Sequence, residues 1–362
     1  LVDEEEPLGR GRGGLVVHWD GSSWSGVAGG TEEDLEAVWG FASDDAWAVG
    51  RRGTILRWDG FGWSAASRDL GDWPLSAVHG AAGDDAWVVG DGGTIMHWNG
   101  RAWSAVESGT EMHLRGVWVS APDDAWAVGE GELGPASSVV LRWDGRSWRT
   151  EDGVPPGLWR AVWAGSAADV WIVGFAVPPI DDGPALAHWD GRAWRSSAAA
   201  ADIGGLQDVW GSASDDVWAV GWSSDPARPA TLMHWDGSVW SATTLGSSAV
   251  LDAVWGSARD DVWAVGFPRS WHWDGTSWSA VPSGTPAARA YDLWGFSSND
   301  VWFVFGSDSS EPTVGIAHWD GSGWSPSHVA SQSGARMHGP WGTTSGDLWL
   351  VGGSGAILRR RE

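Results

Sequence analysis

The sequence contains no cysteine and no lysine. Without Cys, neither a disulfide framework nor a thiolate metal site can hold the fold. Without Lys, all 22 basic residues are arginines, and together with abundant Ala, Gly and Asp this is typical of a GC-rich bacterial genome. The chain also lacks any run of about eighteen uncharged apolar residues, so no membrane-spanning helix is expected.

Positive charge is scarce as well. The formal net charge is −25, and charged residues make up only 19% of the chain. Nucleic-acid binding needs a basic patch to replace the phosphate counterions, and docking on anionic lipid needs one too. The composition therefore argues against both partners, whereas it permits cation binding and favours solubility.

What the chain does contain is a repeat built around tryptophan. In its clearest copy, at 208–241, four short apolar runs each centre on a Trp and are joined by two tight turns. The pattern recurs about every 43 residues, a period typical of four-stranded propeller blades. The runs are β-branched and aromatic and are bounded by Gly and Asp, which predicts strands. No segment shows a sustained helical period.

These repeats predict an all-β fold, a single β-propeller of four-stranded antiparallel blades at 14–362, preceded by an acidic and Gly-rich tail at 1–13. The chain opens with strands three and four of a repeat and closes with strands one and two. The N-terminal strands are therefore expected to complete the C-terminal blade and close the ring, which gives eight blades. Residues 355–361 resemble a further third strand, so seven blades with one odd repeat is the alternative.

The motif Trp-Asp-Gly-x-x-Trp, as at 235–240, resembles the Asp-box family of propeller repeats, with one residue fewer between the Asp and the second Trp. In that family the Asp caps the turn between strands three and four. The whole repeat is also similar to photosystem II assembly propellers and to Trp-rich bacterial lectin propellers. The latter resemblance implies sugar pockets between blades, although one fold hosts many functions.

Two rings of acidic residues are expected at the turns, on one face of the propeller. The first ring is Asp45, Asp85, Asp124, Asp169, Asp216, Asp261, Asp300 and Asp347, and the second is Asp20, Asp59, Asp144, Asp190, Asp236, Asp274 and Asp320, with Asn99 in the remaining copy. Clustered oxygen ligands suit Ca²⁺. An Asp repeated in every turn is explained more simply by capping of backbone N–H groups, and no cofactor is required.

Histidine precedes Trp in six third strands: His18, His97, His188, His234, His272 and His318. Arg57 and Arg142 take its place in two repeats. A shared metal is excluded, because one His per blade leaves neighbours roughly 10 Å apart, whereas Zn–N bonds are about 2 Å long. Replacement by Arg points to a hydrogen-bond donor, with a neighbouring Asp as the candidate acceptor.

Signatures of catalysis are missing. The Gly-rich stretches at 9–14 and 129–134 match GxGxxG, but neither opens a helix, so neither is a phosphate-binding loop. The sequence has no HExxH motif, no GxSxG nucleophile elbow and no Walker motif. Paired carboxylates sit in the repeated turns instead of interrupting them. The chain is therefore expected not to be an enzyme.

Positions that depart from the repeat carry the functional prediction. The loops between strands two and three vary most in length, and they lie on the face opposite the acidic turns, where a rigid scaffold presents binding loops. Three successive repeats place an aromatic residue just after the second strand. The candidate ligand-binding residues are Trp222, Phe175, Phe267, Trp73, Asp225, Arg228, Arg269 and Asp182. The alternative is a minor core beneath long loops.

Three other residues break the pattern without suggesting a ligand. Trp159 and Trp271 occupy positions that are Leu or Met in other repeats, so both are expected in the core. His79 replaces the first-strand Trp near the axis, where it either marks a polar site or fills a gap.

The function expected from these features is that of a secreted or surface binding protein, extracellular or periplasmic, which recognises a glycan by stacking sugar rings on exposed aromatic side chains. A protein-interaction scaffold that uses the same loops or the acidic face is the alternative. A propeller-type glycan hydrolase or lyase, with polar residues at the mouth of the central channel, ranks last.

Overall fold

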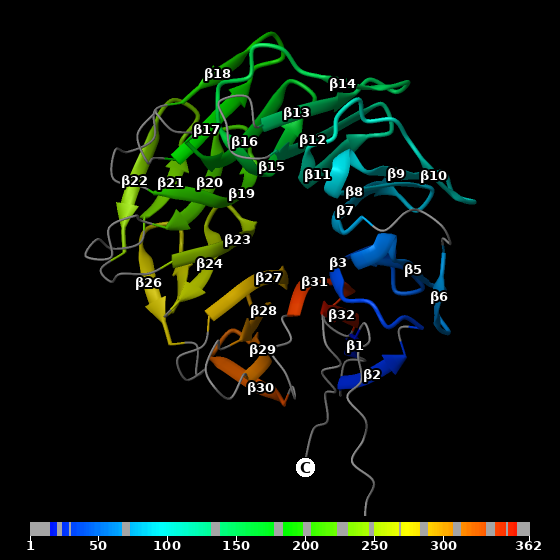
Figure 1. The fold of residues 1–362 in the computed structure, drawn as a ribbon. Coiled ribbons are helices and arrows are strands. Elements are labelled where there is room, and N and C mark those ends of the chain that lie inside the picture. The colour runs from blue at the N-terminus through cyan, green and yellow to red at the C-terminus, as the bar shows by residue number, and fades with distance from the viewer. Residues whose placement is uncertain are drawn as a thin grey trace, which may run out of the picture.

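The computed structural model describes residues 15–19, 24–28, 30–66, 73–131, 138–176, 184–197, 204–222, 231–245, 250–267, 269–282, 289–306, 313–330, 337–344 and 347–352. Antiparallel four-stranded sheets are arranged radially around a central axis (Figure 1). Within this part of the chain, no helix is long and apolar enough to cross a membrane.

Each blade runs from its innermost strand to its outermost strand in chain order. Blade I consists of β3 (Leu35–Ala42), β4 (Asp45–Gly50), β5 (Ile55–Trp58) and β6 (Trp63–Ala65). Blade II consists of β7 (Leu75–Ala82), β8 (Asp85–Gly90), β9 (Ile95–Trp98) and β10 (Trp103–Ala105). Blade III consists of β11 (His113–Ala121), β12 (Asp124–Glu130), β13 (Ser138–Trp143) and β14 (Trp148–Thr150). Blade IV consists of β15 (Leu158–Ser166), β16 (Asp169–Phe175), β17 (Pro184–Trp189) and β18 (Trp194–Ser196).

The remaining contiguous blades follow the same order. Blade V consists of β19 (Gly205–Ala213), β20 (Asp216–Trp222), β21 (Thr231–Trp235) and β22 (Trp240–Thr244). Blade VI consists of β23 (Val250–Ala258), β24 (Asp261–Phe267), β25 (Ser270–Trp273) and β26 (Trp278–Val281). Blade VII consists of β27 (Arg289–Ser297), β28 (Asp300–Gly306), β29 (Thr313–Trp319) and β30 (Trp324–Ala330).

The two ends of the chain meet in a composite sheet. Its strands are β1 (Leu15–Trp19), β2 (Trp24–Ala28), β31 (Met337–Thr344) and β32 (Asp347–Gly352), in the order β2-β1-β32-β31. Within the described residues, seven four-stranded blades are contiguous in the sequence, and the composite sheet shared between the two ends is the eighth four-stranded sheet. Strand β1 pairs with β32 from Leu15↔Gly352 to Trp19↔Leu348, which joins the ends of the chain. The further third strand expected at 355–361 lies outside the described residues.

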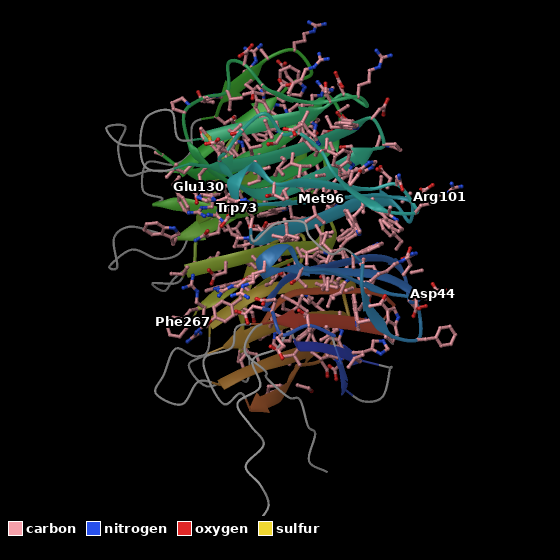
Figure 2. All side chains as sticks on the ribbon, turned by 45° about the vertical axis from the view of Figure 1, so that its right-hand side comes forward. Asp44, Trp73, Met96, Arg101, Glu130 and Phe267 are labelled. Carbon is pink, nitrogen blue, oxygen red and sulfur yellow. The ribbon has the colours of Figure 1, made fainter. Side chains whose placement is uncertain are left out.

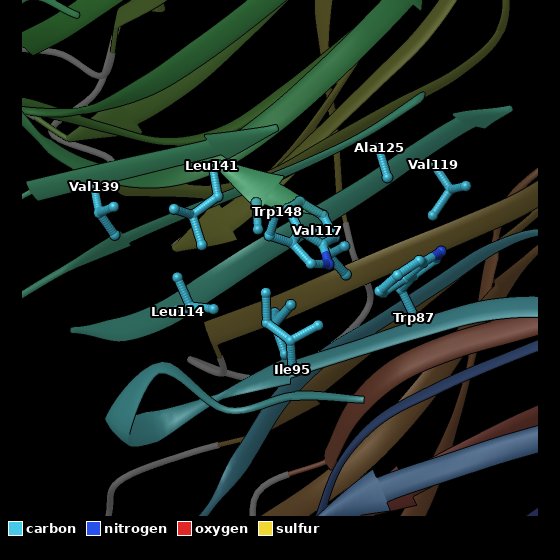
Figure 3. Packing of buried hydrophobic residues seen from close by; sticks show 11 residues of the cluster. Trp87, Ile95, Leu114, Val117, Val119, Ala125, Val139, Leu141 and Trp148 are labelled. Atoms are coloured by element: carbon cyan, nitrogen blue, oxygen red, sulfur yellow. The ribbon is translucent and has the colours of Figure 1, made fainter. Parts of the chain in front are cut away.

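Blades pack against each other through indoles. Trp87, on the second strand of blade II, is fully buried against two Trp residues of blade III. Its ring centroid lies 4.7 Å from that of Trp143 and 5.1 Å from that of Trp148, the latter in an edge-to-face arrangement. Aliphatic side chains such as Leu114 and Leu141 complete this cluster (Figure 3). The geometry recurs between blades, so the sequence repeat is a repeat of interfaces.

Glycine permits the close approach of neighbouring inner strands. Gly256 and Gly295 follow the inner-strand Trp of their blades. A Cβ atom at Gly295 would lie 2.4 Å from the ring of Trp255, and one at Gly256 would lie 2.6 Å from the ring of Trp210. The indole of one blade therefore lies directly against the backbone of the next.

Trp159 and Trp271 are buried, as the sequence predicts.

Candidate functional site

The turn face is built mainly for stability. In blade V, Oδ1 of Asp236 accepts hydrogen bonds from the backbone N–H groups of Ser238 and Val239, at 2.8 and 2.9 Å. Gly237 has a φ of 90°, which a side chain would strain. The same cap is made by Asp59, Asn99, Asp144, Asp190, Asp274 and Asp320. The predicted capping role is confirmed for these residues.

These caps make a proton-linked contribution to stability. The N–H of Val239, with the hydroxyl and N–H of Ser238, lowers the pKa of Asp236 from 3.8 to about 2. Since the pKa is lowered in the folded state, the stabilisation is present above pH 3.8 and is lost as the pH falls towards 2. We expect Asp236→Asn to leave the melting temperature at pH 7 nearly unchanged, because Asn99 serves as a cap in blade II.

Below pH 4, on the same reasoning, Asp236→Asn is expected to lose stability less steeply than the wild type. Melting temperatures between pH 2 and pH 7, followed by circular dichroism, measure this difference. Parallel curves for the two proteins throughout that range would contradict the proton-linked role.

The first acidic ring acts differently from the expected turn cap. Oδ1 of Asp216 lies 2.7 Å from Nε2 of His234 on the third strand, and the His234 ring stacks on Trp218 with centroids 3.9 Å apart. Burial raises the pKa of Asp216, but hydrogen bonds from His234 and Ser212 outweigh that effect, so the net shift is downward. The equivalent acceptor–donor pairs are Asp45–Arg57, Asp85–His97, Asp124–Arg142, Asp169–His188, Asp261–His272 and Asp300–His318. The predicted His–Asp hydrogen bond is thus confirmed.

This arrangement differs from a catalytic triad. Ser212 and His234 both bond to the carboxylate of Asp216, so the carboxylate separates the hydroxyl from the imidazole. A nucleophilic Ser needs the imidazole beside its own oxygen. Among the residues that the structure describes, no group of three or more His, Asp or Glu is placed to hold a metal ion. The hydrogen bonds of the turn face therefore connect neighbouring strands, and their geometry is not that of a catalytic site.

The opposite face carries the variable loops. Figure 2 shows Trp73, Glu130 and Phe267 on this face, with Asp44 and Arg101 on the turn face. Where the second strand of a blade ends, the chain leaves the sheet at a position that we call the exit position. From blade I to blade VII the exit positions are Arg51, Asp91, Glu130, Phe175, Trp222, Phe267 and Gly306. They are charged in blades I to III and aromatic in blades IV to VI.

Two of the aromatic exit residues meet. The ring centroids of Phe175 and Trp222 lie 6.1 Å apart, with the rings tilted by 53°. Gly205 makes this possible, because a Cβ there would lie 2.0 Å from the Phe175 ring. The guanidinium of Arg160 lies over the Phe175 ring, with its Cζ 5.1 Å from the ring centroid. A cation–π contact thus fixes Phe175 beside Trp222.

A chain of ion pairs continues from this aromatic pair. Arg160 bonds to Glu130 at 2.9 Å, and Arg115 bridges Glu130 at 3.4 Å and Asp91 at 3.0 Å. Burial lowers the pKa of Arg160, and the Glu130 carboxylate opposes that effect. We call Asp91, Arg115, Glu130, Arg160, Phe175 and Trp222 the rim arc. It crosses four consecutive blades with a charged end and an aromatic end.

Of the predicted ligand-binding residues, the structure brings two together, leaves three exposed elsewhere on the variable-loop side and does not describe the other three. Phe175 and Trp222 belong to the rim arc, Phe267 is 40% exposed at the next exit position, and Trp73 is 55% exposed. Arg269 is exposed two residues beyond Phe267. Asp182, Asp225 and Arg228 lie outside the described residues. Whether any of these residues binds a ligand stays a prediction.

Sequence reasoning missed the basic residues of the rim arc. Arg115 and Arg160 occupy the same position of the repeat, where the inner strand bulges after its second residue. Other repeats hold Glu36, Ser76, Gln207, Asp252 and Tyr291 there. This position varies in charge and size while the residue before it is always apolar, which is the signal that would have identified it.

No family model matches the chain, and no curated protein matches it. Several solved structures match the chain in fold. The structure titled "YCF48 bound to D1 peptide" is 14% identical, with a TM-score of 0.54, over 89% of this chain and 94% of that one. The C-terminal WD40 domain of Sif2 is 11% identical, with a TM-score of 0.61, over 90% and 97%. Each of these likenesses concerns the fold alone.

The chain is a tryptophan-rich β-propeller. A third structure, the extracellular domain of the putative hybrid two component system BT4673 from B. thetaiotaomicron, is 10% identical, with a TM-score of 0.53. The match covers 88% of this chain and 49% of that one, so this propeller spans about half of the larger domain.

Proposed function

We propose that this propeller is a non-enzymatic binding protein that holds a segment of a partner protein on its variable-loop face. The observation that carries the proposal is the rim arc, in which Arg160 fixes the Phe175–Trp222 pair on the variable-loop face. Rigid aromatic side chains beside an Arg are the usual anchors of protein interfaces. The solved propeller with a bound peptide supports a peptide ligand on this fold.

The turn face is a weaker candidate for the same role. Its first-ring carboxylates are engaged by His or Arg, and its second-ring carboxylates cap turns. The exit positions differ in presenting three aromatic side chains, Phe175, Trp222 and Phe267. The proposal therefore assigns binding to the variable loops and stabilisation of each blade to the turns.

The experiment that tests the proposal selects peptides from a random displayed library against the purified propeller. Enriched peptides are then titrated by fluorescence anisotropy against the wild type and against Trp222→Ala. We expect Trp222→Ala to weaken binding about tenfold or more, as loss of an aromatic anchor does at an interface. Phe175→Ala is expected to act in the same direction.

The matched control is Phe61→Ala. Phe61 is 96% exposed and lies in the second turn of blade I, on the opposite face. Its removal is expected to leave peptide affinity unchanged. If Phe61→Ala abolished binding while Trp222→Ala preserved it, the ligand would belong on the turn face and the proposal would fail.

A glycan remains the second candidate ligand, favoured by the exposure of Trp73 and Phe267. A sugar ring stacks its C–H face on such a side chain, and Arg269 offers a nearby donor. A glycan array probed with the wild type and with Trp73→Ala tests this candidate. We further propose an extracellular or periplasmic location, which is supported by the extracellular domain among the similar structures.

A further inference from the structure

The axis of the propeller holds a cavity of about 370 Å³. Residues from the innermost strand of every blade and of the composite sheet line it, so the cavity is the central channel. Its volume lies near the lower end of the range for small-molecule sites, roughly 300–1,000 Å³. The cavity is therefore large enough for a small organic ligand.

Indoles dominate the wall of this channel. The inner-strand Trp residues that line it are Trp39, Trp118, Trp163, Trp210, Trp255, Trp294 and Trp341. Trp39 lies edge-to-face with Trp294, with centroids 6.0 Å apart, although the composite sheet lies between their blades. His79 takes the inner-strand position of blade II and stacks between Trp39 and Trp118, at 4.4 and 4.6 Å.

Among the described lining residues, every charged side chain is acidic: Glu36, Asp208 and Asp292. Glu36 is paired with Arg51, and Oδ1 of Asp292 accepts the N–H group of Leu293 at 2.8 Å. The two oxygens of Asp208 accept the N–H groups of Val209 and Val254, at 2.9 and 3.0 Å. Each carboxylate oxygen can accept a second bond, so Asp208 is anchored and can still face a ligand.

The aromatic wall and the carboxylates select for the same chemistry. The face of an indole attracts a cation, most strongly a poorly hydrated one, and quaternary ammonium groups are recognised in this way. A carboxylate within the same low-dielectric cavity adds to that attraction. A metal ion is less suited, because indole rings offer no oxygen ligands.

We propose that the central channel binds a small organic cation of the alkylammonium class, enclosed by the inner-strand indoles and held by Asp208 and Asp292. This site is independent of the rim arc, because none of the rim-arc residues lines the cavity among those described. The ammonium group could belong to a free metabolite or to a modified lysine of a protein, and the two sources share this chemistry.

The test titrates choline into the purified full chain by isothermal titration calorimetry. We expect one choline per chain, and about tenfold weaker binding of 3,3-dimethylbutan-1-ol, the neutral isostere that lacks the charge. Asp208→Asn is expected to weaken choline binding about tenfold, and Trp294→Leu to do the same. If Asp208→Asn does not fold, Asp292→Asn replaces it. A trimethyllysine peptide that binds better than choline would assign the ammonium group to a protein.

Trp222→Ala is the matched control, because it removes a rim-arc indole and leaves the channel wall intact. It is expected to retain full choline affinity, so failure of the rim-arc proposal and failure of this one are distinguishable. Equal affinity for choline and its neutral isostere would overturn the proposal. So would the absence of choline binding at millimolar concentration, or unchanged binding in both Asp208→Asn and Trp294→Leu.

Discussion

Replacing Trp218 by Ala is expected to lower the free energy of unfolding by about 3–5 kcal/mol, the usual cost of removing a buried large aromatic side chain. Trp218 is 2% exposed. It contacts His234 within its own blade and Trp273 and Trp278 of blade VI. The substitution therefore opens a cavity at the interface between two blades and removes the ring that supports the His234–Asp216 bond.

Two further variants isolate the cause. Trp218→Phe keeps a ring and removes an indole N–H that is buried without an acceptor in the described part of the chain, so it is expected to cost less than half as much. Phe61→Ala, at a site that is 96% exposed, is expected to change stability by about 0.5 kcal/mol or less. Urea denaturation followed by circular dichroism measures all three. Equal stability of Trp218→Ala and the wild type would show that this indole does not hold blades V and VI together.

The interface built on Trp218 explains why the fold could be read from the sequence. Each repeat places a Trp on the second strand of one blade where the third- and fourth-strand Trp residues of the next blade meet it, as Trp87 meets Trp143 and Trp148. The regular spacing of these residues therefore encodes contacts between neighbours as well as strands. The sheet shared by the two ends was also predictable, because the chain opens with strands three and four of a repeat and closes with strands one and two.

The candidate site was less predictable because it depends on pairs of residues from different repeats. Phe175 and Trp222 could be proposed as neighbours, since each follows the second strand of its blade. That Arg160 covers Phe175 follows from a bulge in β15 and from the ion pair with Glu130 of the preceding blade. The bulge recurs in every contiguous blade, but the residue on it differs from blade to blade, so the ion pair leaves no periodic pattern in the sequence. The channel was equally hard to predict. His79 stacks on Trp residues of the two neighbouring blades, and Asp208 accepts a hydrogen bond from Val254 of the next blade.

His79 and Asp208 lead to the second prediction, which concerns pH. Burial lowers the pKa of His79 from 6.5 to about 4 and raises the pKa of Asp208 from 3.8 to about 6. For His79 the unfolded state binds more protons between pH 4 and 6.5, so its contribution to stability rises with pH there. For Asp208 the folded state binds more protons between pH 3.8 and 6, so its contribution falls with pH. Each shift corresponds to about 3 kcal/mol at most, and the two oppose each other.

The wild type is therefore expected to show only a weak dependence of stability on pH between 4 and 6.5, whereas each single variant should show a strong one. Asp208→Asn removes the falling contribution, so its free energy of unfolding should rise by up to about 3 kcal/mol across this range relative to the wild type. His79→Phe, which keeps a ring between Trp39 and Trp118, should show the opposite slope. Urea midpoints at half-unit steps of pH measure these slopes, and the difference from the wild type cancels the contribution of the other carboxylates. Identical slopes in all three proteins would mean that neither group titrates abnormally, because only a shifted pKa couples its proton to folding.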